Sequence, residues 1–306
     1  MTAGVAISGV ALVRPAGARW TADGRRASPP PDWFDYRREL GQRGYKYVPE
    51  AYRYLLAAAR KALAEAGYPQ PDAAPEDGGL VVGTNSAVAR LHADMDRTVV
   101  AGSAADLSPA TAPYFSINLG GGRLATEYAI KGYHATLTTP RVAGLEAIAV
   151  AARALALERA RWMLVGATEE RLDGAEPAAG LSESGAVALV AHADAAAPPG
   201  SARCRVHLRY LPPDSPVGPV LAAVLAAADA HGDLPVVAVL DGSPLGTAIA
   251  AELPGRARVV PAGAGCLEPL MQVAALLVDA AEPTVVVTAA AEGNLAVALV
   301  CPSPDQ

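Results

Sequence analysis

Apolar residues along this chain alternate between short runs with strand character and longer runs with helical spacing. In the first two thirds, five runs rich in Val, Ile, Leu and Thr predict strands over residues 5–13, 79–83, 134–139, 162–166 and 187–191. Between them, apolar residues recur every three to four positions and predict helices over residues 49–66, 88–99 and 123–130, with a further helix from Thr139. Strands that alternate with helices are typical of an α/β fold.

The last third of the chain repeats this order of elements. Predicted strands at residues 203–210, 234–240, 257–260, 284–289 and 295–300 alternate with predicted helices at 217–230, 245–253 and 265–280. Small residues and prolines at 193–201 separate the two parts. We therefore expect two halves, residues 1–198 and 199–306, in one compact body. Two halves of the βαβαβ type predict a layered α/β/α/β/α arrangement.

Residues 133–153 join a predicted strand to a predicted helix through a sharp turn. Thr139 has a hydroxyl that can cap a helix and Pro140 suits the first helical position, so we expect the helix to begin there. Many enzymes place a nucleophile at such a turn, because the positive end of the helix dipole stabilises an anion. This chain has the cation Arg141 at that place, which requires a compensating anion nearby.

Composition narrows the class of protein. The 306 residues are 52% hydrophobic, and the net charge of −6 lacks the basic excess of nucleic-acid-binding proteins. The cysteines, Cys204, Cys266 and Cys301, lack the spacing of a zinc site or a disulfide framework, so we expect no metal and a reducing compartment. No signal peptide is evident and the apolar runs are too short to span a bilayer, so we expect a cytoplasmic protein with no membrane contact.

Several short motifs resemble those of β-ketoacyl synthases. The segment T-P-R-V-A-G-L-E-A-I at 139–148 resembles the family's T-A-C-A-S-x-L-x-A-I nucleophile turn. The strings V-V-G-T at 81–84, G-A-T-E at 166–169 and E-S-G-A at 183–186 also resemble family motifs, as does G-N at 293–294 before the last predicted strand. The resemblance covers most of the chain in order and implies the thiolase fold.

The same resemblance places altered residues at the three catalytic positions of the family. β-Ketoacyl synthases bind the acyl chain to a cysteine and use two histidines to stabilise the oxyanion and assist loss of carbon dioxide. Arg141 matches the cysteine, Asp241 the first histidine and Cys266 the second. Arginine cannot lose its proton at neutral pH, and an aspartate would repel a developing enolate. We therefore expect no catalytic residue at these positions.

Two expectations for the site follow from the thiolase fold that the resemblance implies. The nucleophile turn and the first histidine face one cavity in that fold, so we expect Arg141 and Asp241 to form an ion pair that fills it. The rival expectation is that Arg141 binds a ligand carboxylate or a phosphopantetheine phosphate. Cys266 near a helix start could have a lowered pKa, so an acyltransferase or hydrolase that uses Cys266 remains an alternative.

The chain most resembles chain length factors, the non-catalytic partners of ketosynthases in type II polyketide synthases. The resemblance implies a heterodimer with a cysteine-bearing ketosynthase, an acyl carrier protein that delivers the polyketide chain, and no cofactor. It implies that a strand pairs across the dimer axis through His134, Ala135, Thr136, Leu137, Thr138 and Thr139. The candidate acyl-tunnel wall is Tyr114, Phe115, Leu119, Gly120, Gly121 and Gly122. A homodimeric module that binds acyl chains or carrier protein, and a purely structural assembly subunit, remain alternatives.

Overall fold

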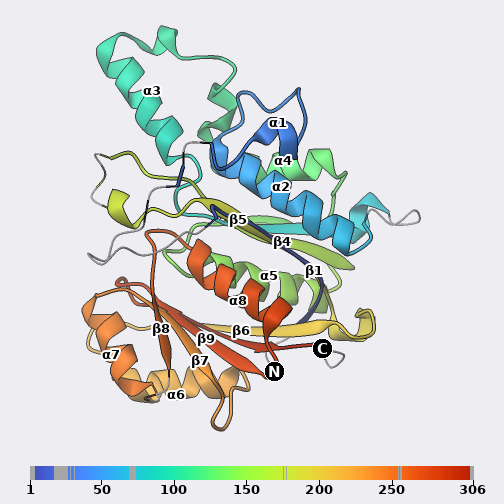
Figure 1. Ribbon diagram of the computed structural model, residues 1–306, viewed down its shortest axis with the longest axis vertical. Helices are drawn as coiled ribbons and strands as arrows, with labels where there is room; N and C mark the ends of the chain where they lie inside the picture. The colour runs from blue at the N-terminus through green and yellow to red at the C-terminus, as the bar shows by residue number, and fades with distance from the viewer. Residues whose placement is uncertain are drawn as a thin grey trace.

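Ten strands form one mixed sheet in the computed structural model, which describes residues 4–16, 27, 29–30, 32–68, 74–174, 176, 178–253, 255 and 257–303 (Figure 1). The strands are β1 (Val5–Val13), β2 (Gly78–Gly83), β3 (His134–Leu137), β4 (Trp162–Glu169), β5 (Gly185–His192), β6 (Ala202–Tyr210), β7 (Val236–Leu240), β8 (Arg258–Pro261), β9 (Thr284–Ala289) and β10 (Asn294–Cys301). All ten predicted strands are present, and most boundaries agree to within two residues.

The α-helices within the described residues alternate with these strands. They are α1 (Tyr36–Glu39), α2 (Glu50–Glu65), α3 (Ala89–Ala101), α4 (Leu119–Glu127), α5 (Ala143–Ala156), α6 (Val217–Ala227), α7 (Pro244–Glu252) and α8 (Leu267–Asp279). Short 3₁₀ turns are η1 (Pro75–Asp77), η2 (Ala104–Asp106), η3 (Ala112–Phe115), η4 (Ala179–Leu181) and η5 (Asp194–Ala196). None of these helices is long and apolar enough to cross a membrane.

The order of the strands shows a duplicated topology. Along the sheet it is β3-β2-β4-β5-β1-β6-β10-β9-β7-β8. Read outward from the centre, the first half runs β1, β5, β4, β2, β3 and the second β6, β10, β9, β7, β8, so each strand has its counterpart five strands later. Antiparallel pairing of Val5–Ile7 with Ala202–Cys204 joins the halves into one sheet. The division at residue 198 stays a prediction.

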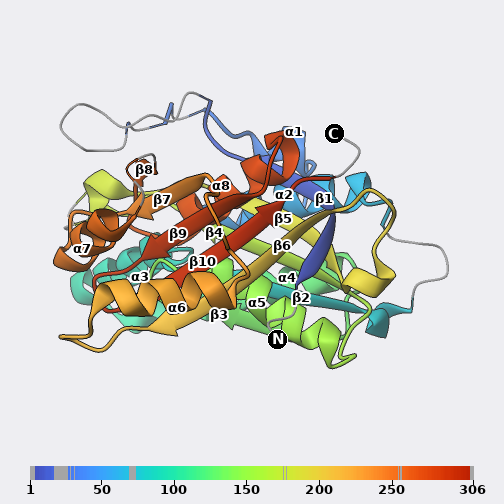
Figure 2. The ribbon, with the colours of Figure 1, turned by 90° about the horizontal axis from the view of Figure 1, so that it is seen from below.

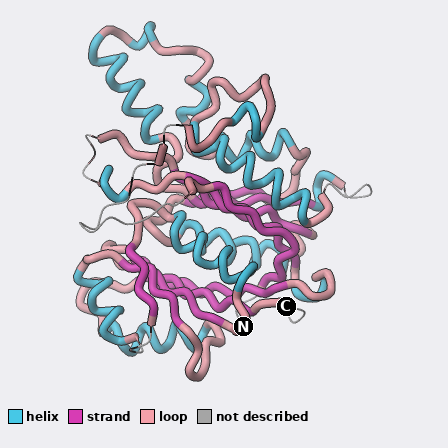
Figure 3. Tube along the Cα trace, viewed as in Figure 1, coloured by secondary structure: helices cyan, strands magenta, loops and turns pink. Residues whose placement is uncertain are grey.

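The elements stack in the five layers expected from the sequence. The sheet curves so that its two halves face each other, with α5 and α8 between them (Figure 1, Figure 3). Helix α2 covers the outer face of the first half, whereas α6 and α7 lie against the outer side of the second half (Figure 1, Figure 2). This mixed α/β body is a thiolase-like fold.

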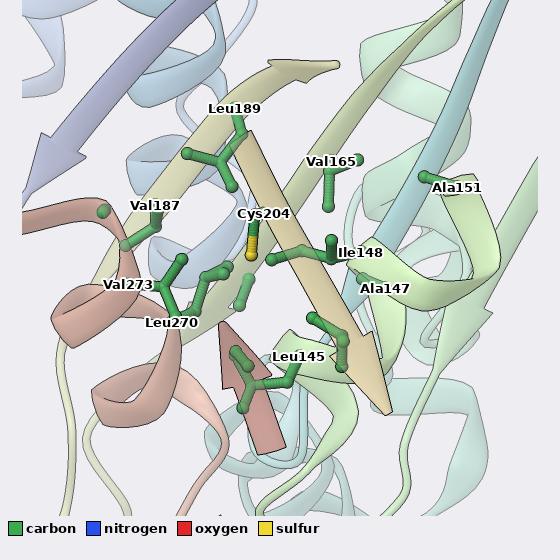
Figure 4. Close-up of a cluster of buried hydrophobic side chains, with 14 of the residues drawn as sticks. Leu145, Ala147, Ile148, Ala151, Val165, Val187, Leu189, Cys204, Leu270 and Val273 are labelled. Carbon is green, nitrogen blue, oxygen red and sulfur yellow. The ribbon is translucent and has the colours of Figure 1, made fainter. Parts of the chain in front are cut away.

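The two central helices pack tightly because each is apolar on the side that faces the other and the sheet. Leu145 and Ile148 of α5 lie beside Leu270 of α8, and each side chain is at most 1% exposed (Figure 4). A Cβ added at Gly144 would lie 2.7 Å from the carbonyl oxygen of Cys266, so only glycine permits this approach. The start of α5 is therefore held against the start of α8.

The predicted start of α5 is wrong. The helix begins at Ala143, and the preceding turn passes through Arg141, whose φ of 61° lies in the left-handed region. A residue with left-handed backbone cannot be part of a right-handed α-helix. The helix therefore does not extend back through Arg141, and Thr139 is not its N-cap. The predicted strand over residues 134–139 is also too long: β3 ends at Leu137, and Thr138 and Thr139 lie beyond it. The interface itself stays a prediction.

Candidate functional site

Arg141 occupies the tip of a strained turn between β3 and α5. A positive φ is unfavourable for a residue with a side chain, so neighbouring contacts must hold this backbone in place. Asn85, from the loop after β2, provides them: its Oδ1 accepts a hydrogen bond from the Arg141 amide at 3.3 Å, and its Nδ2 donates to the Thr138 carbonyl at 2.9 Å. The loop after β2 therefore fixes the direction in which the arginine leaves the turn.

The guanidinium of Arg141 reaches across to the second half of the molecule. Its Nη2 lies 3.0 Å from Oδ2 of Asp241, which follows β7, and its Nη1 donates to the carbonyl of Gly263, after β8. The two charged side chains are only 13% and 21% exposed. Asp241 is held in turn by the amide of Ser243, which donates to its Oδ1 at 3.0 Å. The expected ion pair is confirmed.

A buried carboxylate behind the turn joins the loop after β2 to the start of α8. Glu169, at the end of β4, is fully buried and accepts hydrogen bonds from the amides of Asn85 at 2.8 Å and Ser86 at 2.6 Å. Its Oε1 also accepts from the amide of Cys266 at 2.9 Å. Glu169 therefore connects the two loops that meet at the site, a role that its place in a family motif did not predict.

A second buried carboxylate occupies the positive end of α8. Glu183 is 1% exposed, and its carboxylate accepts hydrogen bonds from the amides of Leu267 at 3.3 Å and Glu268 at 2.8 Å. These amides belong to the first turn of α8, where an anion is favourable. The protein's own carboxylate thus occupies the place where a helix end could otherwise bind a ligand anion.

Cys266 cannot easily form a thiolate in this environment. The residue is 0% exposed and directly precedes α8. Burial raises the pKa of the Cys266 thiol well above its ordinary value, and the neighbouring carboxylates of Glu169 and Glu183 raise it further. The expectation of a lowered pKa is therefore wrong, because the surroundings of the sulfur are apolar and acidic rather than cationic.

The candidate tunnel-wall residues do not all face the same space. A Cβ at Gly120 would lie 2.3 Å from the ring of Tyr52, so this glycine serves the packing of α4 on α2. Gly121 and Gly122 instead border a hollow of about 180 Å³ whose other side is formed by residues 134–136 of β3. Phe115 is 63% exposed and lies apart from that hollow's lining.

Strand β3 is at one end of the sheet and pairs only with β2 among the described strands. The amide of Leu80 donates to the carbonyl of Tyr133, and the amide of Thr84 donates to the carbonyl of Leu137. The backbone groups of the odd-numbered residues of β3 therefore point toward β2. Because alternate residues of a strand face opposite sides, the amides of His134 and Thr136 point away from the sheet. No other strand among the described residues pairs with this edge, so its outward backbone groups are available for a partner strand.

Metal chemistry has no candidate site in the part of the chain that the structure describes. No group of three or more His, Cys, Asp or Glu side chains is placed to hold an ion there. The arrangement at the turn is a charge pair with the buried carboxylates of Glu169 and Glu183 behind it. The ion pair connects the turn before α5 with the loop after β7.

The fold and the turn before α5 define a protein of the ketosynthase type. A family model described as "Beta-ketoacyl synthase, N-terminal domain" matches residues 37–199, just over half of the chain. The chain therefore belongs to the β-ketoacyl synthase family. No curated protein sequence matches it.

Solved structures agree on the fold at low sequence identity. The ishigamide ketosynthase/chain length factor superposes with a TM-score of 0.76 at 22% identity, covering 98% of this chain and 99% of that one. The ketosynthase AntDE, solved with the acyl carrier protein AntF, gives 0.78 at 16% identity, covering 99% and 100%. OleA from Xanthomonas campestris gives 0.58 at 15% identity, covering 98% and 99%.

Proposed function

We propose that this chain is a non-catalytic, chain-length-factor-like subunit that forms a heterodimer with a cysteine-bearing ketosynthase and shapes its acyl tunnel in type II polyketide biosynthesis. The observation that carries the proposal is the ion pair between Arg141 and Asp241. It occupies the two positions that match the family's nucleophile and first histidine. A guanidinium held by a carboxylate and a carbonyl cannot form a thioester.

The surroundings of Cys266 support the same conclusion. A thiol must ionise to act as a nucleophile, and its reactivity depends on exposure and on nearby cations. Cys266 is fully buried beside two carboxylates, and its pKa is raised. These features weigh against the alternative of an acyltransferase or hydrolase that uses Cys266.

The free edge of β3 supports a partner strand in an assembly. An exposed strand edge tends to pair with another chain, and the residues that would do so are His134 and Thr136. The structurally similar ishigamide protein is described as a ketosynthase/chain length factor, and AntDE as a ketosynthase with its acyl carrier protein. By analogy, the partner here is a cysteine-bearing ketosynthase, and the chain in the tunnel is delivered by a carrier protein.

The hollow behind β3 supports a contribution to the acyl tunnel. It lies between Gly121 on α4 and Thr136 on β3, next to the edge where the partner would pair. A tunnel that crosses such an interface would end against α4. Gly121 leaves space there that a larger side chain would fill.

Co-expression tests the proposal directly. The chain is expressed alone and together with a cysteine-bearing ketosynthase as candidate partner, and the complexes are sized by light scattering. We expect a stable 1:1 complex that condenses acyl units, and no condensation by this chain alone. A stable homodimer that acylates at Cys266 would favour the enzymatic alternative. A homodimer that binds acyl carrier protein without acylation would favour the binding module.

A further inference from the structure

A cavity of about 430 Å³ lies where β1 and β6, the central strands of the two halves, separate. It is lined by residues 7–10 of β1, the carboxyl ends of α2 and α8, and residues 198–202, which lead into β6. Figure 1 shows α2 and α8 on opposite sides of β1. We call this space the β1 cavity. Its described lining residues are distinct from the turn at Arg141 and from the lining of the hollow behind β3, so the function proposed above does not use it.

Strand β1 is irregular where it borders this cavity. Its pairing with β6 ends at Ile7 and Ala202, and it has a bulge between Ile7 and Gly9. Ser8, in the bulge, lines the cavity, and its Oγ lies 2.9 Å from Nε2 of the buried His192. Burial lowers the pKa of His192, so the ring is neutral at neutral pH and brings no positive charge to the cavity. The bulge therefore places a hydroxyl group at the cavity wall.

The β1 cavity contains hydrogen-bond acceptors and one negative charge. Glu65, the last residue of α2, is the one ionisable side chain among the described lining residues. Its Oε2 accepts a hydrogen bond at 2.9 Å from the amide of Val10, and no described group donates to its Oε1. The Ser201 hydroxyl donates to the carbonyl of Pro198 at 2.7 Å, so it can only accept from a ligand. The cavity therefore favours a ligand that donates hydrogen bonds.

Two helix ends give the β1 cavity a further negative potential. The carboxyl end of a helix carries a partial negative charge on its last carbonyls, and a cation is stabilising there. Helix α2 borders the cavity through Glu65 at its end, and α8 borders it through Leu277 and Val278 in its last turn. Neither last turn contains a basic residue. The carboxylate and the two helix ends therefore favour a positively charged ligand.

We propose that the β1 cavity binds a small organic cation that carries a primary ammonium group on an apolar body. The three N–H donors of the ammonium group match Oε1 of Glu65 and the hydroxyl acceptors beside it. The apolar body lies against Val10, Leu277 and Val278. The volume of the cavity is within the range of roughly 300–1,000 Å³ that is common for small-molecule sites. An anion is excluded by the carboxylate and the two helix ends.

Calorimetric titration of the full chain with hexylammonium, hexanol and hexanoate tests the preference for charge at one size of apolar body. We expect hexylammonium to bind about tenfold more tightly than hexanol, and hexanoate not to bind. Glu65→Gln keeps an oxygen for the Val10 amide but removes the charge, so hexylammonium should bind about tenfold more weakly and hexanol as before. Glu252→Gln makes the same change at the last residue of α7, away from the cavity, and should bind like the wild type.

Three results would each overturn the site: no saturable binding of hexylammonium up to about 10 mM, equal affinities for hexylammonium and hexanol, or the same loss of affinity in Glu65→Gln and Glu252→Gln. If Glu65→Gln does not fold, Val278→Lys decides. Val278 is 47% exposed, and a lysine in the last turn of α8 supplies the ammonium group from the chain itself. This variant should no longer bind hexylammonium, and undiminished binding rejects the proposal.

Discussion

Arg141 and Asp241 are 100 positions apart in the sequence, yet Nη2 of the arginine lies 3.0 Å from Oδ2 of the aspartate. The arginine leaves the turn before α5 and the aspartate follows β7, so the pair connects the two halves of the molecule. Both side chains are largely buried, where each charge needs the other to compensate for lost hydration. The stability of the protein should therefore depend on both members of the pair.

Removing one partner of this pair should destabilise the protein. Asp241→Ala leaves a mostly buried guanidinium without its counter-ion, and we expect the free energy of unfolding to fall by about 3 kcal/mol. Denaturant unfolding measures the change. Arg141→Gln/Asp241→Asn replaces both charges with amides and should recover much of the loss. Ordinary surface substitutions change the free energy of unfolding by about 0.5 kcal/mol or less. A change no larger than that in Asp241→Ala would show that the pair is not stabilising.

The Cys266 thiol should resist alkylation in the folded protein. Its full burial and raised pKa leave little thiolate at pH 8, whereas Cys301 is partly exposed. With iodoacetamide followed by peptide mass spectrometry, we expect Cys301 to be modified first and Cys266 only after denaturation. Cys301→Ser supplies the control for total labelling. Rapid native labelling of Cys266 would instead support an accessible nucleophile.

Neighbouring glycines of α4 should respond oppositely to alanine. At Gly120 the new methyl would meet the buried Tyr52 ring at 2.3 Å, and such overpacking should cost about 2 kcal/mol of unfolding free energy. At Gly121 the nearest atoms are 3.5 Å and 3.6 Å away, so Ala fits and should add up to about 1 kcal/mol through helix propensity. Thermal unfolding of the two variants provides the comparison. Equal changes in stability for the two variants would contradict the difference in packing around Gly120 and Gly121.

A larger side chain at Gly121 should shorten the products of the ketosynthase complex. Gly121→Phe would fill the hollow of about 180 Å³ between α4 and β3, where the growing chain is proposed to end. Chromatography and mass spectrometry of the polyketides measure chain length. Unchanged products for Gly121→Phe would remove this residue from the tunnel wall.

The edge of β3 can be blocked without disturbing its pairing to β2. The amide of Thr136 faces away from the sheet, so Thr136→Pro removes a donor that only a partner strand would use. We expect the variant to fold normally but to lose the ketosynthase complex on size exclusion. Ala135→Pro removes a donor on the side facing β2 and should lower stability as well. An intact complex with Thr136→Pro would place the interface elsewhere.

Much of this architecture could be predicted because it is encoded locally. The period of apolar residues identified all ten strands, since alternation and helical spacing follow from backbone geometry. The ion pair could also be anticipated, because a cation at the start of a helix needs an anion and the fold implied by the family resemblance places Asp241 in the same cavity. The start of α5 was missed: Thr139-Pro140 is a typical helix-start pair, but the left-handed Arg141 delays the helix to Ala143.

The sequence by itself determined the duplicated order of elements and the resemblance to β-ketoacyl synthases, and it predicted that Arg141, Asp241 and Cys266 stand at the family's catalytic positions. Tertiary structure alone decided that Cys266 is a buried thiol with a raised pKa, that Gly120 serves packing while Gly121 borders a hollow, and that the Glu170 carboxyl accepts a hydrogen bond from the first turn of α3. The order of elements could be predicted because the periodicity of apolar residues depends on neighbours along the chain. Burial, pKa and free space depend on residues brought together from distant positions by the fold.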